Sequence, residues 1–108
     1  MTEQISMQEQ IKQTIEANPI VLFMKGNASF PQCGFSGRAI QILQALDAKF
    51  VTIDVLSNDQ VRQGVKDFSN WPTIPQLYLK GEFIGGSDIM TEMYEAGELK
   101  QLVDGLNS

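Results

Sequence analysis

Cys33 is the residue most able to take part in chemistry, because it is the chain's one cysteine and carries its one thiol. It follows an apolar run by a short loop and stands at or next to the expected start of a helix. Backbone N–H groups and the helix dipole at such a position stabilise a thiolate and lower the pKa of a cysteine. Lys25 ends the apolar run and adds a positive charge, while Pro31 and Gly34 favour an exposed side chain. A reactive or ligating thiol is one interpretation. A packed, inert small side chain is the other, since free cysteines are among the most buried residues.

Residue counts restrict the chemistry that can accompany this thiol. The 108 residues include no histidine, which removes imidazole bases and histidine metal ligands. A single cysteine forms no disulfide within the chain. Thirteen acidic and eight basic residues give a net charge of −5, which repels phosphate backbones, so no nucleic-acid partner is expected.

The beginning of the chain, Met1 to Gln4, has neither the basic nor the apolar stretch of a targeting segment. No apolar run approaches the length of a membrane span. We therefore expect a cytoplasmic or equally reducing location and no membrane partner.

Alternating helix and strand patterns surround Cys33. Helices are expected between Ser6 and Asn18, from about Cys33 to Leu46, from Ser57 or Asn58 to Phe68, from Ser87 or Asp88 to Gly97, and over a last turn or two from Leu99 to Leu106. Strands are expected at Ile20–Met24, Val51–Val55, Leu77–Leu79 and Glu82–Ile84, the last two joined by a turn at Lys80-Gly81. The first two strands and their helix form a parallel unit, which the hairpin extends antiparallel. Residues 1–108 are thus predicted to form one α/β domain, a three-layer sandwich with a four-stranded mixed sheet flanked by helices.

Three further residues carry expectations about packing. Gly64 weakens the third helix. Trp71 is interpreted as packing beneath its loop, with a binding platform as the alternative, and Phe30 as core or loop packing.

Four short motifs, taken in order, resemble those of the monothiol glutaredoxins. They are Cys33-Gly34-Phe35-Ser36, the preceding Met24-Lys25-Gly26, Trp71-Pro72-Thr73-Ile74-Pro75 and Gly85-Gly86-Ser87-Asp88. Each motif alone is weak, but the four together are specific, and the match runs from about Ile11 to Leu106. The resemblance implies a thioredoxin-like fold with Cys33 as the reactive residue. Ser36 stands where a Cys-x-x-Cys enzyme has its resolving thiol, so any disulfide of Cys33 must be with another molecule, of which glutathione is expected.

The resemblance also implies a glutathione site built from several segments. Lys25 and Arg62 would hold the glycine carboxylate, and Lys66, one helical turn after Arg62, could assist. Judged without the resemblance, Lys25 and Arg62 are each better interpreted as a solvated surface charge. Thr73 and Ile74 would present their backbone to the cysteinyl unit of glutathione, with a cis peptide bond before the proline that follows.

The last part of the implied site is a helix start. Ser87 and Asp88 would hold the γ-glutamyl carboxylate through backbone N–H groups, and the Asp88 side chain would receive the α-amino group. An ordinary helix cap is the alternative, and both can hold at once. Many relatives have cysteine at the position of Ser87, so this chain lacks a second thiol that could pair with Cys33.

Two functions follow from the resemblance. An all-thiolate [2Fe–2S] cluster needs four sulfurs, and two copies of Cys33 with two glutathiones supply them, so the family implies a homodimer that bridges a cluster and passes it on. BolA-like proteins and iron–sulfur acceptor proteins are the partners that the family implies. The alternative is a glutathione-dependent thiol–disulfide oxidoreductase that removes glutathione from proteins through Cys33, so whether the protein is an enzyme stays open, with weak activity at most expected.

Overall fold

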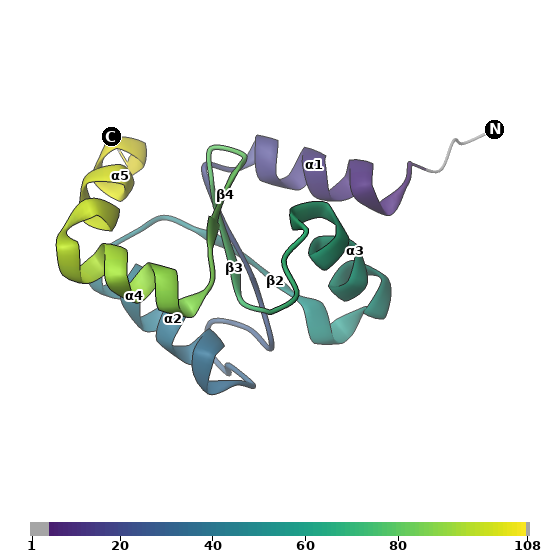
Figure 1. Cartoon of the computed structure of the whole chain (residues 1–108), viewed down its shortest axis with the longest axis horizontal. Coiled ribbons are helices and arrows are strands. Elements are labelled where there is room, and N and C mark those ends of the chain that lie inside the picture. The colour runs from purple at the N-terminus through teal and green to yellow at the C-terminus, as the bar shows by residue number, and fades with distance from the viewer. Residues whose placement is uncertain (1–4, 108) are drawn as a thin grey trace.

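The computed structural model describes residues 5–107, so the expectation for Met1 to Gln4 lies outside the described residues. Its elements follow one another as α1 (Met7–Ala17), β1 (Ile20–Met24), α2 (Gly34–Ala45), β2 (Val51–Asp54), the 3-10 turn η1 (Val55–Ser57), α3 (Asp59–Ser69), β3 (Gln76–Leu79), β4 (Glu82–Gly85), α4 (Ser87–Ala96) and α5 (Glu98–Asn107) (Figure 1). Among these residues no helix is both long enough and apolar enough to cross a membrane.

The four strands form one mixed sheet in the order β2-β1-β3-β4. β1 pairs with β2 in parallel and with β3 antiparallel, and β3 pairs antiparallel with β4. Lys80 and Gly81 join β3 to β4 with φ angles of 51° and 79°, the left-handed pair that a tight hairpin turn requires. The predicted parallel pair, hairpin and four-stranded sheet are therefore confirmed.

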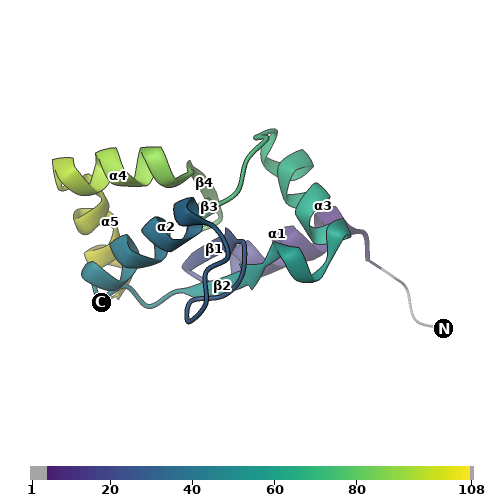
Figure 2. The same ribbon diagram turned by 90° about the horizontal axis from the view of Figure 1, so that it is seen from below.

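Helices cover both faces of this sheet, as Figures 1 and 2 show: α1 and α3 lie on one side, and α2, α4 and α5 lie on the other. Each face of the sheet has its own hydrophobic core, and alternate residues of β1 pack into one core or the other. Leu22 and Met24 pack among residues of α2, α4 and α5, whereas Val21 and Phe23 pack among residues of α1 and α3. Every residue of β1 is buried, which is why its sequence is an unbroken apolar run. The predicted three-layer, thioredoxin-like sandwich is the observed fold.

Gly64 does not break α3, because the glycine gives α1 room to pack closely. A Cβ atom built on Gly64 would lie 2.6 Å from Cγ of Met7. The Gln8 side-chain amide also donates a hydrogen bond to the Gly64 carbonyl, at 3.0 Å. Tertiary packing thus outweighs the low helix propensity of glycine here.

Four local expectations are wrong. Val55 leaves the strand for η1, because the Asp54 carboxylate accepts a hydrogen bond from the Leu56 N–H at 2.8 Å and turns the chain. The cap of α4 is Gly86 rather than Ser87 or Asp88. The final helix, α5, has 10 residues rather than one or two turns. Phe30 is 72% exposed and packs in neither core.

Candidate functional site

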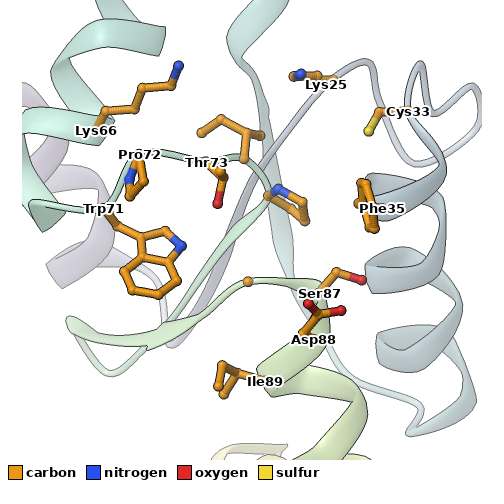
Figure 3. A pocket seen from close by; sticks show the side chains of 13 residues that line it. Lys25, Cys33, Phe35, Lys66, Trp71, Pro72, Thr73, Ser87, Asp88 and Ile89 are labelled. Carbon is orange, nitrogen blue, oxygen red and sulfur yellow. The ribbon is translucent and has the colours of Figure 1, made fainter.

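A cleft of about 450 Å³ opens beside Cys33 (Figure 3). Its lining residues come from the ends of four elements and the loops next to them: Lys25, Cys33, Phe35, Lys66, Trp71, Pro72, Thr73, Ile74, Pro75, Gly86, Ser87, Asp88 and Ile89. Figure 3 shows Cys33 and Phe35 on the α2 side, with Lys66 and Trp71 opposite. The fold therefore brings together segments that are far apart in the sequence.

Most of the residues predicted for the site line this one cleft. Cys33, Lys25, Thr73, Ile74, Ser87 and Asp88 are all part of its lining. Arg62 is not, whereas Lys66, one helical turn further along α3, is. The assignment of Arg62 to the site stays a prediction, and Lys66 is the α3 cation that the cleft itself contains.

Cys33 occupies the cap position of α2, where the helix begins. Its side chain is partly exposed. The backbone N–H of Ser36 has the largest influence on the thiol and lowers its pKa below the ordinary value; burial opposes this, while the Phe35 N–H and the Lys25 charge lower it further. Cys33 is thus a partly accessible thiol whose surroundings favour the thiolate, the nucleophilic and metal-binding form.

The loop from Lys25 to Gln32 is held at both ends. The Gly26 N–H donates to the Asp54 carboxylate at 3.0 Å, and the Gln32 N–H donates to the Lys25 carbonyl at 2.8 Å. Gly26 has φ of 87°, and a Cβ atom there would lie 2.4 Å from the Phe30 carbonyl oxygen, so this position requires glycine. These contacts fix Lys25 and the chain that leads into Cys33.

The wall opposite Cys33 is the segment from Trp71 to Pro75. Its Ile74-Pro75 peptide bond is cis, as the resemblance implied. Trp71 is 40% exposed and its ring centroid lies 5.9 Å from that of Phe83. The indole therefore packs on the protein and also lines the cleft, so the two alternatives considered for Trp71 both describe part of its position.

The third wall is the start of α4. A Cβ atom on Gly86 would lie 3.1 Å from the Pro75 carbonyl oxygen, so the two walls approach closely. Ser87 is 5% exposed, and among the described residues its Oγ has no hydrogen-bond partner. Asp88 is exposed at the first turn of the same helix. A buried hydroxyl without a partner beside a helix start is an incomplete polar site.

Phe35 and Ile89 also line the cleft, and sequence analysis assigned them no role there. Phe35 is 62% exposed and Ile89 is 36% exposed. Phe35 lies two residues after Cys33 and Ile89 directly follows Asp88, each in a first helical turn, and that proximity was the available signal. Their apolar surface adds to that of Trp71 in the lining of the cleft.

Comparisons with known proteins agree with this geometry. A sequence profile described as Glutaredoxin matches residues 20–84. Glutaredoxin 4 of Escherichia coli is 47% identical over 95 residues, covering 88% of this chain and 83% of its own length. An uncharacterized monothiol glutaredoxin ycf64-like protein of Synechocystis is 53% identical, covering 87% and 88%. The mitochondrial monothiol glutaredoxin-5 of Schizosaccharomyces pombe is 52% identical, covering 91% and 69%.

Solved structures agree as well. The solution structure of reduced poplar apo GrxS14 is 46% identical and superposes with a TM-score of 0.79, covering 92% of this chain and 91% of its own. A buckwheat glutaredoxin–glutathione complex is 23% identical with a TM-score of 0.82, covering 94% and 90%, and that likeness concerns the fold alone. The profile match, the identities and the presence of one cysteine in the chain lead to one conclusion: this chain belongs to the glutaredoxin family and is one of its monothiol members.

Proposed function

We propose that this protein binds glutathione in the cleft beside Cys33. Glutathione carries two carboxylates, an α-amino group and a thiol, so its site needs a separate partner for each. Lys25 and Lys66 suit the glycine carboxylate, with Arg62 as a further candidate on the same helix. The exposed carboxylate of Asp88 suits the α-amino group.

The observation that carries this proposal is the start of α4 in the wall of the cleft, where the first backbone N–H groups lack partners within the helix. A carboxylate there would accept hydrogen bonds from these N–H groups. The γ-glutamyl carboxylate of glutathione has this chemistry. The buckwheat glutaredoxin of the same fold forms a complex with glutathione.

The cargo that we propose is a [2Fe–2S] cluster bridged between two copies of the chain. Such a cluster takes four thiolates, and one chain supplies only Cys33. Two copies with two glutathiones complete the set, and the partly exposed, thiolate-favouring Cys33 at the cleft suits a ligand shared across a homodimer. Because glutathione is held without a covalent bond, half of the ligands can dissociate, which favours transfer to an acceptor over storage.

The alternative function is removal of glutathione from proteins, and the lowered pKa of Cys33 favours it. In this reaction the Cys33 thiolate attacks the glutathione sulfur of a protein mixed disulfide, and the protein leaves as a thiolate. A second glutathione thiolate then attacks the disulfide on Cys33. Cys33 is restored as a thiolate and glutathione disulfide leaves.

Iron–sulfur acceptor proteins and BolA-like proteins are the partners that we propose for the cluster-bound form. A cytoplasmic location agrees with the need for a reduced Cys33. Named relatives act in other compartments, including the mitochondrial protein of Schizosaccharomyces pombe.

Two assays on one preparation test these proposals. Calorimetric titration with glutathione should show binding to the wild-type protein, and absence of binding would overturn the proposed site. A turnover assay on a glutathionylated peptide then separates the functions: little turnover supports the carrier, whereas rapid turnover that Cys33→Ser abolishes supports the oxidoreductase.

A further inference from the structure

We propose that Gln76 is the positioning residue for the cleft wall formed by Trp71 to Pro75. The inference rests on the proposed glutathione site, of which Thr73 and Ile74 are part. Gln76 itself does not line the cleft. It lies behind the wall as the first residue of β3 and is 0% exposed.

The side-chain amide of Gln76 makes three hydrogen bonds. Its Nε2 donates to the carbonyl oxygens of Trp71 and Thr73, each at 3.2 Å. Its Oε1 accepts from the hydroxyl of Tyr78, also at 3.2 Å. Since both loop partners are carbonyls, which only accept, the amide nitrogen must face the loop and the oxygen must face Tyr78. The orientation of the amide is thus determined by its partners.

This amide complements a second set of contacts on the same loop. The Trp71 N–H donates to the Ser69 hydroxyl and to the Lys66 carbonyl, each at 3.1 Å. Trp71 is therefore held from α3 through its N–H and from β3 through its carbonyl. Thr73 lies in the middle of the loop, and its carbonyl accepts a hydrogen bond from the Gln76 amide.

Two prolines make the loop dependent on such a donor. Pro72 and Pro75 have no backbone N–H, so the segment has few donors of its own with which to anchor itself. A buried amide that donates to two carbonyls of the loop therefore fixes Trp71 and Thr73 relative to β3. Without this amide, the carbonyls of Trp71 and Thr73 must find water as their hydrogen-bond donor instead. Trp71 and Thr73 both line the cleft, so a shift of the loop changes the shape of the cleft.

A pair of variants tests the proposal. Gln76→Met keeps an unbranched side chain but removes both donors to the loop. Tyr78→Phe is the matched control, because it removes the third hydrogen bond of the same buried amide and leaves both loop contacts in place. We expect Gln76→Met to weaken glutathione binding by about tenfold and Tyr78→Phe by less than about twofold. The pH profile of Cys33 alkylation should be unchanged in both, because Ser36, Phe35 and Lys25 set that pKa.

Equal glutathione affinity in Gln76→Met and wild type would overturn the proposal, and so would equal weakening in both variants. Gln76→Asn, which withdraws the amide by one methylene, replaces Gln76→Met if that variant does not fold. Amide hydrogen exchange in the wild type gives an independent result: the side-chain amide of Gln76 should exchange slowly, and exchange at the rate of free glutamine would contradict the proposal. Wild type that binds no glutathione would instead overturn the proposed function, while the exchange result still decides whether the Gln76 amide holds the loop.

Discussion

The backbone N–H of Lys25 donates a hydrogen bond to the Oγ of Ser36, at 3.1 Å. This contact joins the end of β1 to the first turn of α2, on either side of the loop that carries Cys33. Ser36 is 0% exposed, and because its oxygen is the acceptor here, its own proton is available for the Cys33 thiolate. The residue in the place of a resolving thiol thus supports both the loop and the thiolate.

The backbone N–H of residue 36, which lowers the pKa of Cys33 most, remains in Ser36→Ala, so this variant should raise that pKa only slightly, through loss of the hydroxyl donor. It should also lower the free energy of unfolding by about 1 kcal/mol, because the Lys25 N–H loses its acceptor. Alkylation rates measured across pH and urea denaturation give the two quantities. Ser57→Ala, an exposed serine in η1, is the control. An unchanged alkylation profile in Ser36→Ala would contradict the assignment.

The alkylation rate of Cys33 should fall as pH drops through its lowered pKa, because the thiolate is the nucleophile. Lys25→Gln removes a favourable charge and should shift this profile to higher pH, and salt should shift the wild-type profile in the same direction. Lys100→Gln is the control, since Lys100 pairs with Asp104 on α5. Coinciding profiles for Lys25→Gln and wild type would exclude the electrostatic role of Lys25.

The same shift predicts how stability varies with pH. The folded thiol has a lower pKa than the unfolded one, so its contribution is fully present above the unfolded pKa and is lost as pH falls through the folded pKa. Cys33→Ala should remove this part of the pH dependence in denaturation experiments. If the stability of Cys33→Ala increases with pH as much as that of the wild type, groups other than Cys33 cause the increase.

Gly64→Ala should destabilise the protein by about 1 kcal/mol, although alanine is the better helix former. The added Cβ would lie 2.6 Å from Cγ of Met7 and 3.1 Å from Cδ1 of Ile11. Gly105→Ala in α5 is the control, because its Cβ would meet no atom within 4 Å, and it should stabilise by about 0.5–1 kcal/mol. Thermal denaturation compares them, and stabilisation in both would contradict the close packing of α1 on α3.

Lys66→Gln should weaken glutathione binding by about two- to fivefold, the usual size of a partly exposed ion pair. Arg62→Gln should weaken it less, because Lys66 lines the cleft and Arg62 does not. Both residues are partly buried on α3, so the two variants are matched. Calorimetric titration with glutathione measures both affinities, and a larger loss in Arg62→Gln would restore the assignment made from sequence.

The fold could be predicted because its signals are local. A strand buried on both faces needs an unbroken apolar run, and β1 has one. A left-handed hairpin turn favours glycine, and Lys80-Gly81 between two apolar segments therefore indicates the hairpin. Gly64 shows the limit of such reasoning, since its effect depends on a neighbouring helix. The bounds of α5 were missed for another reason: its apolar residues follow a regular helical spacing from Leu99 to Leu106, but the polar residues Glu98 and Asn107 at its two ends add nothing to that pattern.

The site was predictable where a motif fixes a residue next to the reacting group, as for Cys33 and Ser36. The site was less predictable where the direction of a side chain decides whether that residue lines the cleft. Arg62 and Lys66 lie one turn apart with the same charge, and only the packing of α3 determines which of them borders the cleft. The contribution of Gln76 could not be read from the sequence at all, because it depends on a loop folding back over β3.

In the proposed carrier, two chains and two glutathiones together hold one cluster. The most direct test is anaerobic reconstitution with iron and sulfide, with and without glutathione, followed by absorbance, size-exclusion chromatography and native mass spectrometry. We predict a brown dimer that forms only with glutathione, contains two glutathiones per cluster and is absent in Cys33→Ser. A colourless monomer under every condition, or a cluster that forms equally well without glutathione, would contradict this arrangement.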